Sequence, residues 1–335
     1  MLKIFSILII VILAGFLQPH AMHAQFLSNQ DVGSVFIELV QQFSGPVKEF
    51  QGPNENYVAW IRSSSIDVNR ATITWIHNGD TVASGLGVKT YQFRTGDVGE
   101  RESLRAIVVA NGGRRLEASQ VFRINNVDLL WTANTTVPAW YKGKALASPR
   151  SIITVSAFPE IMRNGSKTPS SQLIYRWSLD NDFIPEESGA GRRNFSFRAD
   201  LIPGTEHEIT ITVSDLSGTR GAQKTIVIPV AGPKVLFYEE RPLEGTVIGA
   251  ALTNFILPAG TQSTFRAVPF FFTRGAPLSY KWLIDGEAAQ EEGLPDILRL
   301  TAAIGSGGLV SISTTINNVR NILQRIAGSF TINVQ

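Results

Sequence analysis

The chain has 335 residues, and its 30 Lys and Arg against 28 Asp and Glu give a formal net charge of +2. This balance disfavours nucleic acid or another strongly acidic partner, because both call for a markedly basic surface. Hydrophobic residues make up 44% of the chain and cysteine is absent, so the composition is that of a globular protein without disulfides or a cysteine-dependent lipoprotein signal.

The first residues have the pattern of a secretory signal. Lys3 precedes an apolar run over residues 4–17, and small residues follow at Ala21 and Ala24. The run is shorter than the roughly 20 apolar residues that span a membrane. We therefore expect a signal peptide over residues 1–24 and an exported protein that is periplasmic, cell-surface or extracellular. The cleavage site stays open, as does an uncleaved segment, which would then be the route of membrane contact.

Three tryptophans mark a long repeat. Trp75, Trp177 and Trp282 are spaced by roughly 100 residues, the size of one β-sandwich module. We expect each ring to fill the space between two sheets. A pair of residues typical of two-residue hairpin turns, which need positive φ, follows each tryptophan at the same offset. These pairs are Asn78-Gly79, Asp180-Asn181 and Asp285-Gly286.

Short segments of alternating hydrophobicity surround the tryptophans, which is the pattern of half-buried strands. The clearest lie in the middle of the chain, at residues 151–159, 194–198, 208–215 and 224–230. We predict an all-β chain of three tandem Ig-like modules, at 26–126, 127–232 and 233–335, each stabilised by its own hydrophobic core. Residues 318–326 space their apolar side chains as a helix would, so a short helix or an irregular edge is expected before the final strand.

The middle module resembles PKD and related bacterial Ig-like domains. It shares with them a Tyr-x-Trp strand at residues 175–177, a polar turn at residues 180–182, and a late alternating strand at residues 209–215 that ends in aspartate before Ser217-Gly218. The full Trp-x-Phe-Gly-Asp-Gly signature of PKD domains is missing. The resemblance implies a PKD-like β-sandwich, and it implies a place among the surface layers, adhesins, pilus-associated proteins and hydrolase spacers that carry such domains.

Few residues beyond the predicted signal could carry chemistry. His77 and His207 lie in different modules, without a Ser or Cys arrangement for nucleophilic catalysis. We therefore expect structural histidines, no cofactor and no enzymatic activity. Asp180 and Asp182 are the best candidates for calcium ligands, but Ile184 stands where a third oxygen would be needed. A solvated hairpin turn is the favoured interpretation of this pair.

Residues 131–141 hold three aromatic side chains among polar neighbours, Trp131, Trp140 and Tyr141. Such rings can form a platform that binds a sugar or a protein. The alternative, which we favour, is that they pack the joint between the first and second modules. The three phenylalanines at residues 270–272 are equally compatible with a core, a module contact and an exposed docking patch.

These patterns together favour an exported, non-enzymatic envelope or surface protein, a scaffold for adhesion, pilus or surface assembly through protein–protein contacts. Its partners would be envelope or surface proteins, including pilus or surface-layer components, with a glycan as the other candidate. The alternative function is a secreted carbohydrate-binding protein that uses the aromatic rings of residues 131–141. Coplanar, exposed rings there favour the alternative, and rings buried at a joint contradict it.

Overall fold

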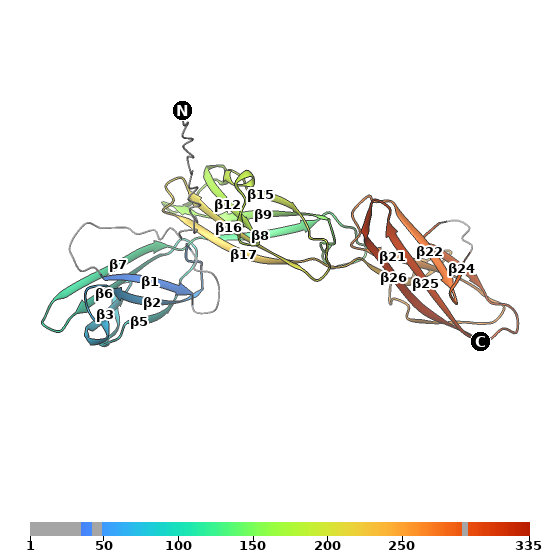
Figure 1. Cartoon of the computed structure of the whole chain (residues 1–335), viewed down its shortest axis with the longest axis horizontal. Coiled ribbons are helices and arrows are strands. Elements are labelled where there is room, and N and C mark those ends of the chain that lie inside the picture. Colours follow the sequence, from blue (N-terminus) through green and yellow to red (C-terminus); the bar gives the residue numbers. More distant parts are fainter. Residues whose placement is uncertain (1–34, 42–48, 290–293) are drawn as a thin grey trace, which may run out of the picture.

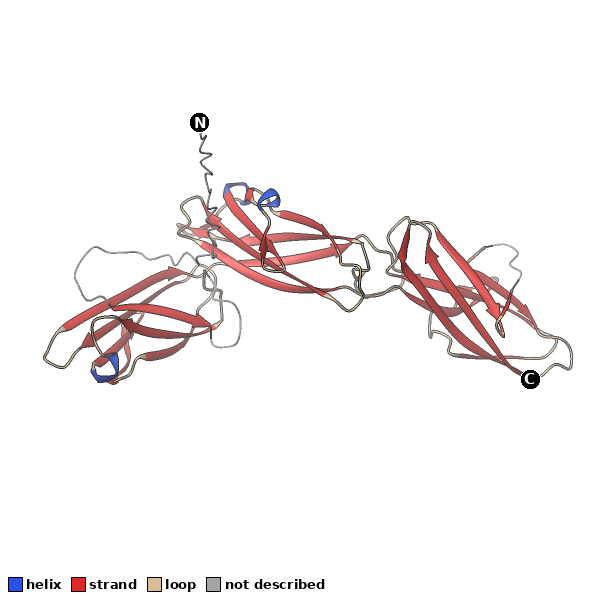
Figure 2. Cartoon of the chain, in the orientation of Figure 1, coloured by secondary structure: helices blue, strands red, loops and turns tan. Residues whose placement is uncertain are grey.

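The computed structural model describes residues 35–41, 49–289 and 294–335. In this part of the chain the helical elements are three single 3₁₀ turns, and the other elements are β-strands (Figure 2). The strands form three groups in a row, and the C-terminus lies at the far end of the third (Figure 1). The chain is a tandem array of Ig-like β-sandwich modules, as the repeat predicted. The 3₁₀ turns are Val68–Arg70, Ser170–Gln172 and Pro185–Glu187.

The segment predicted as a signal peptide, residues 1–24, lies outside the described residues. Within them, the structure holds no helix with the length and apolar character that crossing a membrane requires.

Module 1 consists of two sheets, and their strands come from residues 35–123. One sheet has the order β1 (Val35–Gln41), β2 (Asn56–Ser63) and β5 (Thr90–Arg94). The other has the order β4 (Asp80–Leu86), β3 (Thr72–His77), β6 (Arg101–Val109) and β7 (Arg115–Arg123). The buried side chains of β2, β3 and β6 alternate with exposed or half-buried ones, so each sheet presents one apolar face to the other.

Module 2 repeats this arrangement within residues 126–229. Its smaller sheet has the order β15 (Asn194–Arg198), β9 (Ile152–Glu160) and β8 (Asn126–Ala133). Its larger sheet has the order β13 (Asp182–Phe183), β12 (Leu173–Leu179), β16 (Glu206–Asp215) and β17 (Gly221–Pro229), and β14 (Gly189–Ala190) also pairs with β12. A short hairpin of β10 (Met162–Arg163) and β11 (Ser166–Lys167) stands apart.

Module 3 spans residues 234–334. One sheet has the order β19 (Gly245–Thr246), β18 (Lys234–Arg241), β21 (Gln262–Phe270) and β24 (Ile297–Thr301). The other has the order β20 (Asn254–Leu257), β26 (Asn321–Val334), β25 (Gly308–Asn318), β22 (Leu278–Ile284) and β23 (Glu287–Ala288). β20 runs parallel to β26, whereas the other pairs of this module are antiparallel.

A tryptophan fills the centre of each module, which confirms the prediction. Trp75 and Trp177 are 0% exposed and Trp282 is 1% exposed. Each indole Nε1–H donates to a backbone carbonyl, so that burial leaves no polar atom of the ring without a partner. The acceptors are Val88 O at 2.8 Å, Arg192 O at 2.9 Å and Pro295 O at 3.0 Å.

The residue three positions after each tryptophan fastens a turn to the sheet. Asn78, Asp180 and Asp285 have φ values of 51°, 52° and 49° and open two-residue hairpin turns, as predicted. The side-chain Oδ1 of each accepts a hydrogen bond from a backbone N–H on the neighbouring long strand. The donors are Ser103, Glu208 and Ser311, each at 2.8 Å. The three modules therefore share one stabilising device besides the buried ring.

The helix considered for residues 318–326 is wrong, because β25 and β26 form a hairpin there, with an irregular register at residues 317–318. Ile322 and Leu323 are 86% and 40% exposed, so the helical spacing of apolar residues marks no buried face. The buried residues of this turn region are instead the polar Asn318 and Gln324, whose side chains hydrogen-bond to each other.

Candidate functional site at the joints between modules

Backbone pairing joins modules 2 and 3. Residues 134–136, which follow β8, lie antiparallel to residues 271–274, which follow β21, with Thr135 and Thr273 as a bridge pair. Three backbone hydrogen bonds of 2.8 Å cross this joint. They run from Phe271 N to Thr136 O, from Thr136 N to Phe272 O, and from Arg274 N to Asn134 O. A linker of freely rotating residues would give no such ladder, so this pairing fixes how the two modules meet.

A buried glutamine reinforces the same joint. Gln324 is 0% exposed, and its Nε2 donates toward Ser148 Oγ at 2.8 Å and Pro149 O at 3.0 Å in module 2. Within module 3, Nε2 also lies 2.9 Å from Thr273 Oγ1. Oε1 accepts from Thr273 N at 3.0 Å and from Asn318 Nδ2 at 2.7 Å. The amide is therefore fully satisfied only while both modules stay in place.

Two of the predicted platform rings lie at this joint, and not between modules 1 and 2 as we had favoured. Trp140 meets Tyr238 edge-on, with ring centroids 6.1 Å apart, and Tyr141 meets Phe270 edge-on at 5.4 Å. The rings lie there because β8 begins beside module 1 and runs the length of module 2, so that the residues after it reach module 3 (Figure 1). A strand of its length spans about 26 Å at about 3.3 Å per residue.

Phenylalanines of residues 270–272 serve both the core and the joint. Phe272 is 1% exposed and belongs to the core of module 3. Phe270 and Phe271 form a separate apolar cluster at the joint, against which Val137 and Leu146 of module 2 pack. The further buried members of this cluster are Tyr238 and Val268, and Ala231, Leu236 and Ala251 also pack against it. The module-contact interpretation therefore holds for the first two phenylalanines and the core interpretation for the third.

Trp131 does not join the other two rings. It lies on β8, half-buried against the core of module 2, and its side chain faces inward with that of Leu129. The Lys144 Nζ lies 3.3 Å from the centroid of the Trp131 ring, a cation–π contact. Partial burial lowers the pKa of Lys144. The predicted set of three rings is therefore divided between the module 2 core and the joint.

The aspartates of the calcium candidate have different surroundings. Asp180 Oδ2 lies 2.9 Å from His207 Nδ1, and Asp180 Oδ1 accepts from the Glu208 N–H at 2.8 Å. Both oxygens are thus used within module 2, while Asp182 is exposed on β13. Across the ranges that the structure describes, no three His, Cys, Asp or Glu side chains are grouped as a metal ion would require.

Both histidines hold strands together. The Asp200 N–H donates to His207 Nε2 at 3.1 Å, so Nδ1 carries the hydrogen and donates to Asp180. His207 is 3% exposed, which leaves its ring little access to a substrate.

In module 1, His77 Nε2 lies 2.7 Å from Glu102 Oε2, and His77 Nδ1 lies 3.1 Å from the Tyr91 hydroxyl. Burial acts to raise the pKa of Glu102, but hydrogen bonds from His77, Asn78 and the Gly96 N–H outweigh it and hold this pKa below its ordinary value. The ionised carboxylate is thus part of the folded module.

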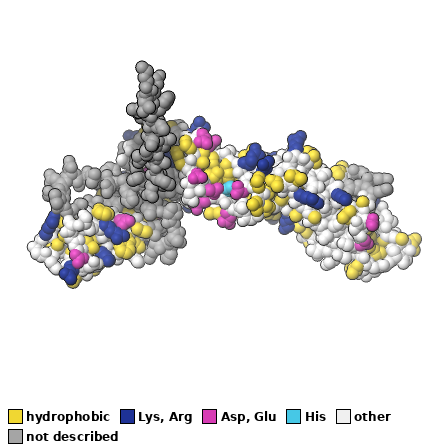
Figure 3. All heavy atoms as spheres, viewed as in Figure 1, with side chains coloured by type: hydrophobic (Ala, Val, Ile, Leu, Met, Phe, Trp, Pro, Cys, Tyr) yellow, Lys and Arg dark blue, Asp and Glu magenta, His cyan; other side chains and the backbone are white. Residues whose placement is uncertain are grey.

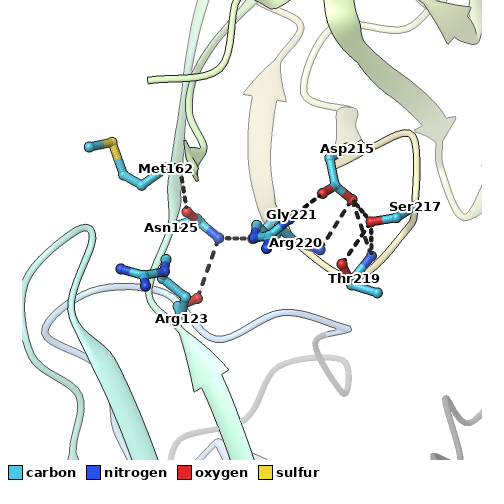
Figure 4. Close-up of polar contacts among 8 residues, drawn as sticks. All are labelled: Arg123, Asn125, Met162, Asp215, Ser217, Thr219, Arg220 and Gly221. Atoms are coloured by element: carbon cyan, nitrogen blue, oxygen red, sulfur yellow. Dashed lines mark hydrogen bonds and ion pairs between the residues drawn. The ribbon is translucent and has the colours of Figure 1, made fainter. Parts of the chain in front are cut away.

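A buried asparagine connects modules 1 and 2 (Figure 4). Asn125 is 1% exposed, its Nδ2 donates to Gly221 O at 3.2 Å, and its Oδ1 accepts from Met162 N at 2.9 Å. Gly221 has no space for a side chain, because a Cβ there would lie 2.4 Å from the Phe50 ring. On the surface of the same joint, Glu49 and Arg176 form an ion pair.

The aspartate that ends the late strand of module 2 organises the neighbouring turn (Figure 4). Asp215 Oδ1 accepts from Ser217 Oγ at 2.8 Å and from Thr219 N at 3.2 Å, and Oδ2 accepts from Arg220 Nη1 at 3.1 Å. Burial acts to raise the pKa of Asp215, but these donors keep it below its ordinary value. This aspartate is therefore structural.

Comparisons with known proteins assign the chain to no family. No protein-family model matches the chain, and no curated protein sequence matches it. Fibronectin(III)-like modules of Clostridium thermocellum CbhA share 18% identity over 58% of this chain and 94% of theirs, with a TM-score of 0.24. The central fibronectin-III array of RIM-binding protein shares 11% identity over 86% and 93%, with a TM-score of 0.26.

A third solved structure is SGBP-B of the Bacteroides ovatus mixed-linkage glucan utilization locus in complex with a mixed-linkage heptasaccharide. It shares 13% identity over 92% of this chain and 71% of that chain, with a TM-score of 0.19. Identities and TM-scores this low leave ligand and partner undecided. The chain is similar to these proteins as an array of Ig-like and fibronectin III-like β-sandwiches.

Proposed function

We propose that this protein is an exported, non-enzymatic scaffold of the bacterial envelope or cell surface, used for adhesion, pilus or surface assembly through protein–protein contacts. The observation that carries the proposal is the joint between modules 2 and 3, where backbone pairing and the buried Gln324 amide hold the modules in one arrangement. Modules joined within a chain move relative to each other unless their interface prevents it. A fixed joint suits a protein that presents surfaces at a set spacing.

Two further features support this function. His77 and His207, the histidines outside the predicted signal, are engaged in hydrogen bonds that hold strands together. The apolar run at residues 4–17 and the PKD resemblance of module 2 fit export and a surface role. We include PKD-like membership of module 2 in the proposal, on the residues at 175–177 and 209–215.

The test places a photo-crosslinking amino acid at one exposed apolar position per module in the native cell. Leu86, Leu216 and Leu243 are 70%, 74% and 99% exposed in modules 1, 2 and 3. We expect crosslinks to a defined envelope or surface protein from at least one of these positions, and export that is lost when residues 2–24 are deleted. A cytoplasmic protein, or an exported one that crosslinks to no protein from any module, would contradict the proposal.

A second candidate function is carbohydrate binding by Trp140 and Tyr141, the two predicted platform rings that lie at the joint with module 3. The observation in its favour is that Trp140 and Tyr141 keep 37% and 38% exposure although their edges contact module 3. Rings held in this way are oriented before a sugar arrives. Trp140→Ala should then weaken retention on a neutral polysaccharide gel, while the equally aromatic and 54% exposed Phe183→Ala in module 2 should not. Equal retention of both variants argues against this function.

A further inference from the structure

A basic hollow lies where modules 2 and 3 meet. Its volume is about 310 Å³, and four arginines line it, two from each module. Lys and Arg side chains gather around this joint on the face shown in Figure 3. Among the described residues that line the hollow there is no acidic side chain and no aromatic ring. The arginines are Arg150 and Arg198 of module 2 and Arg274 and Arg320 of module 3.

These four guanidinium groups have no counter-ion within the described part of the protein. Within the described residues none of the four forms an ion pair with a carboxylate. Arg198 Nη1 donates a hydrogen bond to the backbone carbonyl of Arg150 at 3.2 Å. Elsewhere in module 3 the contrast is plain, because Arg266 pairs with both Glu240 and Asp296. The four side chains are exposed, so water and salt weaken their mutual repulsion, and an anion bound among them would remove it.

The backbone conformation of Arg150 also indicates that its side chain has a function. Its φ is 61°, a left-handed conformation that is unfavourable for residues other than glycine, asparagine and aspartate. The turn is held by the Arg150 N–H, which donates to Asp200 O at 3.3 Å, and by the Arg198 bond to Arg150 O. A glycine would make both backbone bonds without strain. Strain of this kind at a residue whose side chain faces a hollow indicates a use for that side chain.

We propose that the basic hollow binds an oxyanion carried by an acidic polysaccharide, a carboxylate or a sulfate. Guanidinium groups donate paired N–H bonds that match the two oxygens of such an anion. Asn134 lies in the same lining, and because its Oδ1 accepts from the Ile152 N–H, its Nδ2 is left to donate to a neighbouring hydroxyl group. The volume is at the lower end of the roughly 300–1,000 Å³ of small-ligand sites, which fits a short stretch of sugars. The absence of aromatic rings disfavours single-stranded nucleic acid, whose bases need stacking partners.

This site is independent of the scaffold function, because it needs no protein partner. The first measurement is calorimetric titration of the whole protein with four probes: tetragalacturonate, a sulfated oligosaccharide of similar length, neutral maltotetraose and inorganic sulfate. We expect one of the two acidic oligosaccharides to bind with a dissociation constant of about 1 mM or tighter. The acidic member that binds identifies carboxylate or sulfate as the anion. Binding should weaken as NaCl rises from about 0.05 M to about 0.5 M.

Variants separate the site from the fold. Arg150→Gly keeps both backbone bonds and removes the strained φ, so its melting temperature should be unchanged or higher while its affinity falls by about tenfold or more. Arg320→Ala should lower affinity similarly. Arg299→Ala is the matched control, because Arg299 is exposed on β24 of module 3 and lies outside the lining. We expect its affinity to equal that of the unmodified protein.

Several results would overturn the proposal. One is the absence of binding by either acidic oligosaccharide, and another is equal binding of neutral maltotetraose. A loss of affinity as large for Arg299→Ala as for Arg150→Gly would show general charge attraction. Tighter binding of polyglutamate or of single-stranded DNA than of both acidic oligosaccharides would assign the hollow to an acidic protein segment or to nucleic acid.

Discussion

Replacement of Gln324 by methionine tests whether hydrogen bonding fixes the joint between modules 2 and 3. Methionine keeps a side chain of similar length but offers no N–H and no amide oxygen. The glutamine amide has two N–H donors and one oxygen that accepts two bonds, so four of the contacts around Gln324 can form at once. At about 1 kcal/mol net for each bond, the expected loss is about 4 kcal/mol. Half of it belongs to Ser148 and Pro149, across the joint.

Hydrogen exchange with peptide-level mass spectrometry is the assay, because it reports each module separately. The two bonds across the joint amount to about 2 kcal/mol, so we expect Gln324→Met to accelerate exchange in peptides that cover residues 134–136 and 271–274 by about 30-fold, with little change in module 1. Arg325→Met is the control, since Arg325 is exposed on the same strand, and a surface change of this kind costs about 0.5 kcal/mol or less. Equal protection of the joint peptides in both variants would refute the reasoning.

Two further predictions concern single modules. Asp285→Ala should destabilise module 3 by about 2 kcal/mol in urea unfolding, because it removes the bond from Ser311 N and puts alanine at a φ of 49°. Asp285→Gly removes the same bond without the strained φ, so it should cost about half as much. Equal losses of stability in the two variants would contradict the strain argument. The pKa of Glu102 is lower in the folded than in the unfolded state, so its contribution to stability is present above its ordinary value of 4.5 and is lost as the pH falls through the folded pKa. Glu102→Gln should therefore flatten the decline of module 1 stability with acid, and an unchanged slope between pH 5 and about 3 would exclude this role.

The fold could be predicted because its main signals are local. Trp75, Trp177 and Trp282 recur with the module, and the hairpin pair after each occupies positions where positive φ is required. Alternation along the strands shows which side chains face inward without any knowledge of neighbours. For residues 318–326 the same reasoning failed, because apolar spacing alone does not distinguish a helix from a strand with exposed apolar residues, such as Ile322.

The joints could not be predicted, because they depend on residues far apart in sequence. Trp140 follows module 1 closely along the chain, yet β8 carries it to the opposite end of module 2. Gln324 and Asn125 are polar residues without a pattern, and only the positions of their distant partners show that they are buried. The left-handed backbone of Arg150 likewise has no sequence signal, since no glycine or asparagine marks that turn.

The hydrogen bonds of the joint between modules 2 and 3 explain why this contact region has both a fixed geometry and a charged hollow. An apolar contact such as that of Phe270 and Phe271 resists separation but has little directional preference. Backbone bonds at Thr136 and the amide of Gln324 are satisfied in one arrangement, so they determine the angle that the apolar cluster leaves free. That angle brings two arginines of each module around one space. An anion bound there contacts both modules at once, and by linkage it stabilises the arrangement that creates its own site.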